Sequence, residues 1–307
     1  MKRVLLTGAS GFVGRLCLPM LIKNGYDVHA VSRNLIPKLE LSGITPHAQN
    51  LLEPGSPTKL IHRVRPDFLL HLAWYPALPG KFWNAPENLD WVRASLELFD
   101  AFAKMGGKRL VAAGSCAEYG STTGECKEDQ TLLLPTTLYG ISKHSLEQVL
   151  RSWSLHIGLS SAWGRIFHLY GPNENAERVI PYVVRSLLRN EPALCSAGKQ
   201  ILDFLHVEDV SSAFIALLQG EVQGPVNIGS GNPLSLRSVL EEVGRQIGRI
   251  DLIRFGTREA AQQATDIWPN TRKLIESTSW RPRCELAEGI GQTIAWWRSQ
   301  LGLAQTK

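Results

Sequence analysis

The stretch KRVLLTGASGFVG, residues 2–14, decides the fold of this chain. It places Gly8, Gly11 and Gly14 directly after a short apolar run and at the start of a helical pattern. Glycine is needed where a chain turns sharply from a strand into a helix and where the backbone must approach a pyrophosphate closely. The helix that follows would offer free N–H groups and the positive end of its dipole to such an anion. We therefore predict a dinucleotide-binding turn at this position.

Apolar runs alternate with helical patterns through the first half of the chain. The patterns predict strands at 2–8, 27–33, 66–74 and 108–115 and helices at 12–25 and 89–106. Such alternation is typical of parallel strands joined by helices. We therefore predict an α/β fold with a doubly wound parallel sheet of the Rossmann type. Pro19 lies inside the first helix and should kink that helix or end it early.

The second half of the chain is less regular. Its patterns predict a helix between loops within 171–192, a strand, turn and helix over 203–220, a short strand at 225–231 and a helix at 235–248. We expect residues 1–165 plus about 203–230 to form the dinucleotide-binding domain. A smaller, mainly C-terminal substrate domain would then comprise about 166–202 plus 231–307.

The composition is that of a globular protein. The 307 residues are 44% hydrophobic and 20% charged, which allows a sizeable core. No apolar run approaches the roughly 20 residues that span a membrane, and the N-terminal run is too short for a signal peptide, so we expect a cytoplasmic protein. The five cysteines lack paired spacing, which predicts free thiols and no metal site. The net charge of +5 is dispersed, which favours small anionic ligands over nucleic acid.

The end of the second predicted strand bears on the choice of dinucleotide. An acidic residue there would accept hydrogen bonds from the adenosine ribose and favour NAD, whereas arginine can hold the 2′-phosphate of NADP. This chain has Ser32 and Arg33 at that end, and Asp27 lies at the opposite end of the strand. We therefore expect NADP, as NADPH, to be preferred and NAD to be the weaker ligand, although Arg33 also fits a solvated strand-end charge.

A tyrosine and a lysine lie four positions apart in LYGISKHSLEQVL, residues 138–150. Residues i and i+4 share a helix face, so the Lys143 amine can approach the Tyr139 phenol. Taken alone, the pair is better explained as a packed tyrosine beside a solvated surface lysine. The pair gains meaning only from the motifs around it.

Seven strings in a fixed order resemble those of the extended short-chain dehydrogenase/reductase family, which contains nucleotide-sugar epimerases, dehydratases and reductases. They span nearly the whole chain: TGASGFVG at 7–14, GSCAEYG at 114–120, YxxxK at 139–143, RIFHLYGP at 165–172, DFLHVEDV at 203–210, NIGSG at 227–231, and WRP followed by LAEGI within 280–290. Each string is modest alone, and their order and spacing together are highly specific.

The resemblance implies that Ser115, Tyr139 and Lys143 are catalytic. Tyr139 would act as general acid toward a carbonyl oxygen, or as base toward an alcohol, with its phenolate stabilised by Lys143. Lys143 would also hold the nicotinamide ribose, and Ser115 would hydrogen-bond the reacting oxygen. The further cofactor contacts that the resemblance implies, beside the three glycines, Ser32 and Arg33, are Phe12, Val13, Asn50, Leu51, Leu72, Ala73 and Ile166.

The residues after Ser115 narrow the reaction. Dehydratases and decarboxylases of the family carry an extra carboxylate where this chain has Cys116 and Ala117, so elimination is disfavoured. We expect strand alternation to point Glu118 away from the site. What remains is hydride transfer, and the Ser32–Arg33 pair favours NADPH-dependent reduction of the 4-keto group of a nucleotide-activated deoxy sugar. The alternatives are an NAD(P)-dependent nucleotide-sugar 4-epimerase and a reductase of a non-sugar carbonyl compound.

The predicted substrate side departs from the family pattern. His168 replaces an asparagine, and Leu202 replaces an arginine that grips nucleotide phosphates in many relatives. Arg258 is a candidate replacement phosphate ligand, or else a surface charge. Trp74 and Val179, with Cys116, Ala117, His168 and Arg258, complete the expected substrate-binding set.

The aromatic run at 71–83 keeps the non-sugar alternative open, because its rings could stack on a flat molecule. A dinucleotide-sensing binding protein without catalysis is a further alternative, disfavoured by the complete catalytic set. Helices near 87–104 and 139–156 form a dimer bundle in many relatives, so we expect a homodimer.

Overall fold

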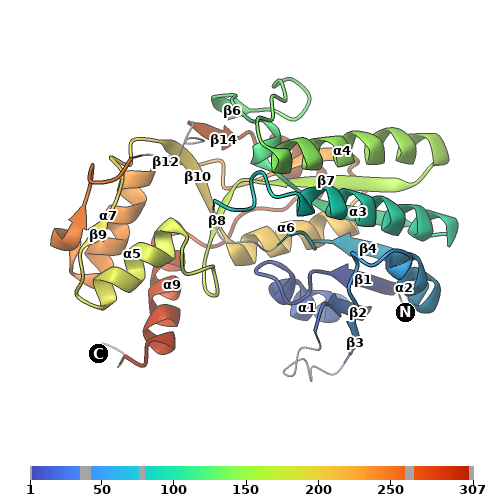
Figure 1. The fold of residues 1–307 in the computed structure, drawn as a ribbon, viewed down its shortest axis with the longest axis horizontal. Helices are drawn as coiled ribbons and strands as arrows, with labels where there is room; N and C mark the ends of the chain where they lie inside the picture. The colour runs from blue at the N-terminus through green and yellow to red at the C-terminus, as the bar shows by residue number, and fades with distance from the viewer. Residues whose placement is uncertain (1, 35–42, 76–79, 260–265, 304–307) are drawn as a thin grey trace.

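A parallel sheet forms the larger part of the structure, a computed structural model that describes residues 2–34, 43–75, 80–259 and 266–303 (Figure 1). The described strands of this sheet follow the order β11-β7-β5-β4-β1-β2-β3, and all their pairings are parallel. The predicted doubly wound parallel sheet is therefore confirmed. Its strands are β1 (Lys2–Thr7), β2 (Tyr26–Ser32), β3 (Ile44–Ala48), β4 (Phe68–His71), β5 (Arg109–Ser115), β7 (Ser160–Ile166) and β11 (Gly224–Ile228).

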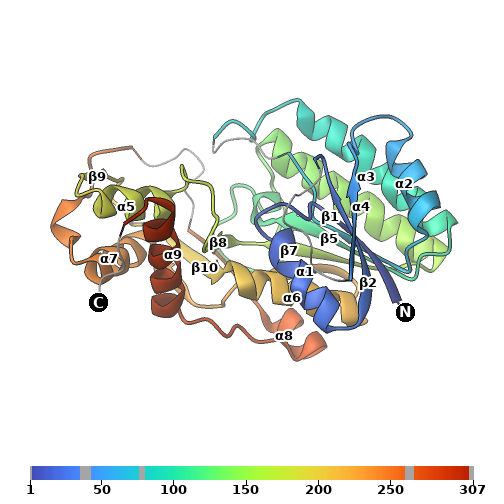
Figure 2. The ribbon, with the colours of Figure 1, turned by 90° about the horizontal axis from the view of Figure 1, so that it is seen from below.

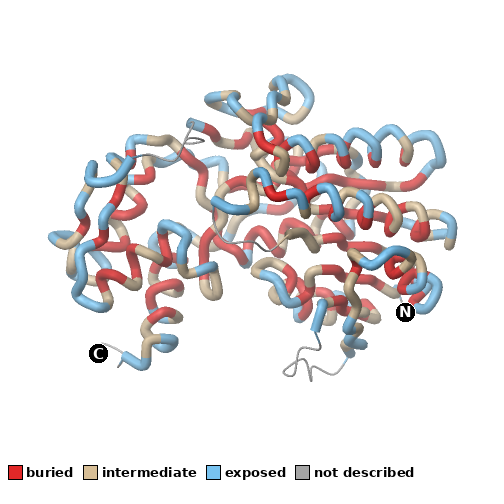
Figure 3. The backbone as a smooth tube through the Cα atoms, viewed as in Figure 1, coloured by how far each residue is buried: buried red, intermediate tan, exposed pale blue. Residues whose placement is uncertain are grey.

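Helices cover both faces of this sheet (Figures 1 and 2). One face carries α2 (Ser56–Val64), α3 (Glu87–Lys104) and α4 (Leu138–Ile157), and the other carries α1 (Gly14–Lys23) and α6 (Val207–Gln219). Each face of the sheet has its own apolar core. Phe99 and Phe102 of α3 belong to the core on the first face, and Phe214 of α6 belongs to the core on the other face. Figure 3 shows the buried residues of the helices turned toward the sheet. Parallel strands buried on both faces account for the continuous apolar runs in the sequence.

A second, smaller group of elements lies beyond the carboxyl end of the large sheet (Figure 1). Its helices α5, α7 and α9 pack around one apolar cluster. Residues 203–206, expected in the dinucleotide-binding domain, belong to β10, which pairs in the second sheet; the division into domains stays a prediction. The elements of this group are β6 (Gly124–Cys126), β8 (His168–Tyr170), α5 (Val179–Leu188), β9 (Ala193–Leu194), β10 (Ile201–His206), β12 (Pro233–Ser235), α7 (Leu236–Ile247), the 3₁₀ turn η2 (Ile250–Leu252), β13 (Ile253–Arg254), β14 (Ile267–Pro269) and α9 (Leu286–Gln300). Two further elements belong to the larger part: the 3₁₀ turn η1 (Cys116–Glu118) follows β5, and α8 (Arg272–Thr278) packs on α6 and β11.

Helix α1 runs through Pro19 to Lys23, so the proline does not end the helix early. Leu18 and Leu21 are buried beside it, and their packing against the sheet offsets the one hydrogen bond that proline cannot make. Helix α4 begins where Thr137 accepts a hydrogen bond from the Gly140 N–H at 3.1 Å. This cap fixes the first turns of α4, which carry the YxxxK residues.

The turn between β1 and α1 leaves no room for side chains at two glycines. A Cβ on Gly14 would lie 2.1 Å from the Gly8 carbonyl oxygen. Gly8 has φ of +72°, and a Cβ there would lie 2.8 Å from the backbone of both Leu72 and Ala73. The first helix therefore starts in direct contact with the turn that precedes it and with the end of β4.

We predict that Gly14→Ala lowers the free energy of unfolding by about 1–3 kcal/mol, because the added methyl group must push the Gly8 carbonyl aside. Urea denaturation followed by circular dichroism measures the change. Gly291→Ala in α9 is the control: its Cβ would meet only the Gln246 Oε1 atom, at 3.3 Å, and alanine favours the helix. Equal losses in the two variants would contradict the steric argument.

Candidate active site

The three predicted catalytic residues come together at the carboxyl edge of the large sheet. Ser115 is the last residue of β5, and Tyr139 and Lys143 lie on the first two turns of α4. The Ser115 side chain lies close enough to the Tyr139 phenol to lower its pKa. The Lys143 Nζ donates a hydrogen bond to the Ala113 carbonyl oxygen at 2.8 Å, two residues before Ser115. The YxxxK pair therefore faces the end of β5, and Lys143 is not a surface charge.

Lys143 is buried in a largely apolar setting. The residue is 3% exposed, and its Nζ lies 3.7 Å from the ring centroid of Trp74 and 5.7 Å from that of Trp163. Burial lowers the pKa of Lys143 to about 7, and the nearby Glu118 carboxylate partly opposes this shift. Ring faces and one backbone carbonyl therefore hold the ammonium group.

Aromatic rings surround the Tyr139 side chain. Phe82, Trp83 and Trp74 pack edge-on against its ring, at centroid distances of 5.1, 5.8 and 6.4 Å. The Tyr139 N–H also donates to the Trp83 carbonyl oxygen at 2.8 Å. Burial raises the pKa of Tyr139 to about 12, while the nearby Ser115 side chain acts in the opposite direction. The phenol is thus protonated at neutral pH and can donate a proton.

Ser115 leads into the short turn η1 rather than continuing as a strand. Its Oγ accepts a hydrogen bond from the Ala117 N–H at 3.2 Å, which leaves the hydroxyl proton free to donate. Glu118 does turn away from the site, but the reason differs from the one expected: the 3₁₀ turn directs it inward, where it is fully buried and accepts from Arg165 at 2.7 Å. Cys116 is partly exposed, and burial of its thiol raises its pKa to about 12.

The predicted cofactor residues lie along the carboxyl edge of the large sheet, with Leu72 and Ala73 next to the glycine turn. The Ala73 N–H donates to the Thr7 Oγ1 at 3.3 Å, and Leu72 N–H to the Thr7 carbonyl oxygen at 3.2 Å, so the end of β4 lies against β1. Asn50 and Leu51 follow β3, and Ile166, the last residue of β7, is in register with Ser115. These positions lie at or just beyond the carboxyl ends of parallel strands, where dinucleotides bind in this type of sheet.

Helix α1 begins at this edge with its N-terminus uncapped by any side chain of the described residues. Its first turn, next to Phe12 and Val13, can therefore donate N–H groups to a pyrophosphate, and the two crowded glycines allow the close approach this requires. At the end of β2, the Ser32 Oγ donates to the Asn34 carbonyl oxygen at 2.6 Å, and the Arg33 side chain is exposed. The residues present fit a dinucleotide.

The substrate side contains a residue that sequence reasoning missed. Arg178 is the N-cap residue of α5, and its guanidinium lies 5.6 Å from the ring centroid of Phe82, one of the rings packed on Tyr139. Burial lowers the pKa of the neighbouring His168 to about 4, and the Arg178 charge lowers it further, so His168 is neutral. Arg178 directly precedes an apolar helical run in the sequence, and this position could have identified it as a candidate.

The remaining substrate-side residues surround the start of α5. Val179 is the first residue of α5, and the Arg258 guanidinium lies 5.1 Å from the ring centroid of Tyr182, one turn further along. Leu202 is buried in β10, where it pairs with Ile267. The two arginines therefore flank the first turn of α5. Leu202, which stands where many relatives have an arginine, is part of the apolar core instead.

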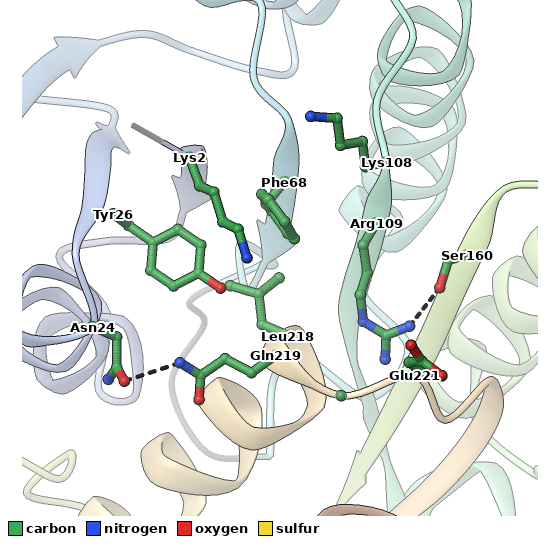
Figure 4. Close-up of a pocket in the computed structure, with 11 residues that line it drawn as sticks. Lys2, Asn24, Tyr26, Phe68, Lys108, Arg109, Ser160, Leu218, Gln219 and Glu221 are labelled. Atoms are coloured by element: carbon green, nitrogen blue, oxygen red, sulfur yellow. Dashed lines mark hydrogen bonds between the residues drawn. The ribbon is translucent and has the colours of Figure 1, made fainter.

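A pocket of about 370 Å³ lies at the opposite edge of the large sheet (Figure 4). Its lining includes the first residues of β1, β4, β5 and β7, far along the strands from Ser115. Its Arg109 is buried, with hydrogen bonds to the Ser160 Oγ and to the Leu217 and Val222 carbonyl oxygens. This pocket contains none of the predicted catalytic or cofactor residues.

Within the described ranges, no helix combines the length and apolar character needed to cross a bilayer. Nor do the described His, Cys, Asp and Glu side chains form a cluster of three or more that could hold a metal ion.

Comparisons with known proteins agree with the fold. The model of the NAD dependent epimerase/dehydratase family matches residues 4–229. The chain is 24% identical to the GDP-6-deoxy-D-mannose reductase of Pseudomonas aeruginosa, over 98% of both chains. Among solved structures, MoeE5 in complex with UDP-glucose and NAD is 27% identical, with a TM-score of 0.83 and coverage of 97% of this chain and 99% of that one.

The UDP-glucose 4-epimerase of Thermotoga maritima, solved with UDP-glucose, has the same fold, with a TM-score of 0.88, 22% identity and coverage of 97% of this chain and 99% of that one. The chain therefore belongs to the NAD dependent epimerase/dehydratase family. Its class is that of the extended short-chain dehydrogenases/reductases that modify nucleotide sugars, as the sequence motifs predicted.

We predict that Lys143→Met raises the free energy of unfolding at pH 6 by about 1–3 kcal/mol, because it removes a buried charge whose desolvation outweighs its contacts. Between pH 7 and the unfolded pKa near 10.5, the folded wild-type protein binds fewer protons than the unfolded chain, so its stability rises with pH. The advantage of the variant should shrink over that window.

Urea titrations from pH 6 to pH 10 would measure this difference. Lys104→Met is the control, because Lys104 is exposed on α3 and pairs with Asp100. A stability gain for Lys143→Met that stays constant with pH would show that the lysine is not buried as a charge.

Proposed function

We propose that this protein is an NADPH-dependent reductase that reduces the 4-keto group of a nucleotide-activated deoxy sugar. The observation that carries the proposal is the convergence of Ser115, Tyr139 and Lys143 at the end of β5, where the phenol is protonated and Lys143 donates to the Ala113 carbonyl oxygen. A proton donor, a hydrogen-bond donor for the reacting oxygen and a buried cation are the groups that carbonyl reduction requires. The membership of the nucleotide-sugar class supports the choice of substrate.

Bound NADPH would supply the hydride. Tyr139 would give its proton to the carbonyl oxygen as negative charge develops there, and Ser115 would donate a second hydrogen bond to the same oxygen. Lys143 would stabilise the resulting phenolate and contact the nicotinamide ribose. The rings of Trp74, Phe82 and Trp83 would exclude water from the phenol, which strengthens each of these interactions.

The substrate diphosphate would bind at the start of α5. Arg178 and Arg258 flank its first turn, and the N-terminus of α5 has no side-chain cap in the described residues. A helix N-terminus with two guanidinium groups suits a diphosphate. This arrangement would compensate for Leu202, which leaves no guanidinium on β10 at that place. Val179, His168, Cys116 and Ala117 would line the sugar site.

A second candidate function is a nucleotide-sugar 4-epimerase that retains a tightly bound NAD. The specific support is MoeE5, a relative of 27% identity solved with both UDP-glucose and NAD. An epimerase removes and returns the same hydride, so it consumes no external cofactor.

We also propose a homodimer, because α3 and α4 expose apolar side chains such as Leu89, Ile141 and Val149.

Deuterated NADPH and a nucleotide 4-keto-deoxy sugar separate the two functions. We predict that deuterium enters the sugar at C4 and that Tyr139→Phe lowers kcat about 10²- to 10⁴-fold, because the proton donor is lost while the cofactor site stays intact. Tyr26→Phe, at the opposite edge of the sheet, is the matched control. Interconversion of two sugars by the purified protein without added cofactor would instead establish the epimerase.

We predict that Arg33→Ala weakens NADPH binding about tenfold and leaves the NADH dissociation constant unchanged, because the guanidinium would contact only the 2′-phosphate. Fluorescence titration of both reduced dinucleotides measures the two constants. Arg15→Ala, next to the glycine turn, is the control that should weaken both ligands alike if it has any effect. Tighter binding of NADH than NADPH by the wild-type protein would rule out the NADPH preference.

A further inference from the structure

The carboxylate of Glu118 lies directly behind the proposed catalytic serine. Its Oε1 accepts hydrogen bonds from the Ser115 N–H and the Trp163 Nε1, both at 2.8 Å, and its Oε2 accepts from the Arg165 Nε at 2.7 Å. Glu118 is fully buried, and Arg165 is 1% exposed. Every described partner of the two oxygens is therefore a donor.

The backbone around Glu118 is packed to fit it. A Cβ on Gly114 would lie 2.6 Å from the Glu118 Oε1 and 2.1 Å from the Trp163 Nε1, so only glycine can precede Ser115 here. On the other side of η1, a Cβ on Gly140 would lie 2.5 Å from the Ala117 carbonyl oxygen. The turn that Glu118 anchors thus also presses against the α4 residue that follows Tyr139.

We propose that Glu118 is the positioning residue of the active site, holding Ser115 and the first turn of α4 in place through the backbone of residues 115–118. This inference rests on the proposed function. Glu118 touches no substrate; it acts by fixing the Ser115 N–H and the turn, while the Ser115 Oγ accepts from Ala117 and keeps its proton for the reacting oxygen. Its charge also lies close enough to Lys143 to favour the ammonium form.

Glutamine cannot replace Glu118 without a conflict. Because both carboxylate oxygens accept from N–H groups, the amide nitrogen of a glutamine would face either Arg165 or the Ser115 and Trp163 donors. Glu147 offers a matched control, since its Oε2 lies 3.8 Å from the Nη2 of the same Arg165 but it has no hydrogen bond to Ser115. A glutamine at either position removes one buried carboxylate from that arginine.

The test compares Glu118→Gln with Glu147→Gln in the full-length protein. We expect Glu118→Gln to lower kcat about 10- to 100-fold, with KM and the NADPH dissociation constant changed by less than about twofold, because a misplaced reacting group affects the chemical step most. Glu147→Gln should retain kcat within about threefold. Equal losses of kcat in both variants would overturn the proposal and indicate a general structural role of the ion pairs.

A second readout does not depend on turnover. Amide hydrogen exchange, followed by mass spectrometry of a peptide containing residues 114–119, should be faster in Glu118→Gln than in the wild-type protein and Glu147→Gln. Unchanged exchange in this peptide, or acceleration throughout the chain, would overturn the positioning role even if the wild-type protein reduced no keto sugar. If only the proposed function is wrong, the wild-type protein will reduce no keto sugar, but exchange in the 114–119 peptide will still be faster in Glu118→Gln.

A double variant separates positioning from simple misfolding. Glu118→Gln combined with Arg165→Met removes the cation that the glutamine leaves without its closest partner. Because Arg151 still pairs with Glu147 at 3.3 Å, the double variant should recover part of the lost thermal stability. It leaves the lost alignment of Ser115 unrepaired, so kcat should stay low. Recovery of kcat together with stability would overturn the proposal.

Discussion

The turn from β1 into α1 is the constraint on which the rest of the structure depends. Gly14 and the Gly8 carbonyl oxygen approach so closely that a Cβ at Gly14 would overlap it. Because Gly8 also lies against Leu72 and Ala73, the same turn fixes the distance between β1 and the end of β4. Strand β4 pairs in parallel with β1 on one side and with β5 on the other. The carboxyl ends of the three strands therefore lie at the same edge of the sheet, and Ser115 at the end of β5 lies at the edge where the glycine turn is.

At that edge, the protein handles charge in two different ways. Lys143 is surrounded by the Trp74 and Trp163 rings and a single backbone carbonyl, so its ammonium group pays a large desolvation penalty and sits near its titration point. Glu118 and Arg165, only one residue layer away, neutralise each other through a direct hydrogen bond. A poised amine beside a fully compensated ion pair is an arrangement suited to proton transfer.

The substrate side shows how one family scaffold can change its ligand contacts without changing its fold. The sheet matches that of relatives with 22–27% identity, which leaves most side chains free to vary. Leu202 contributes to the second core, whereas Arg178 directly precedes α5 and Arg258 contacts Tyr182 on its first turn from a distant segment. Anion recognition at a helix N-terminus needs guanidinium groups within reach, and they can come from several positions along the chain.

The sequence by itself determined the parallel α/β fold and the glycine turn, because apolar runs and glycine spacing are local patterns. Its motifs, through their family resemblance, also singled out Ser115, Tyr139 and Lys143 as the candidate catalytic set. The tertiary structure alone decided the rest. Apart from β10, which the sequence partly predicted, the second sheet is built from strands of only three residues whose pairing partners are distant in sequence, so no local period marks them. The surroundings of Arg178 and Glu118 were likewise not predictable, since folding alone brings Phe82 to the first side chain and Arg165 and Trp163 to the second.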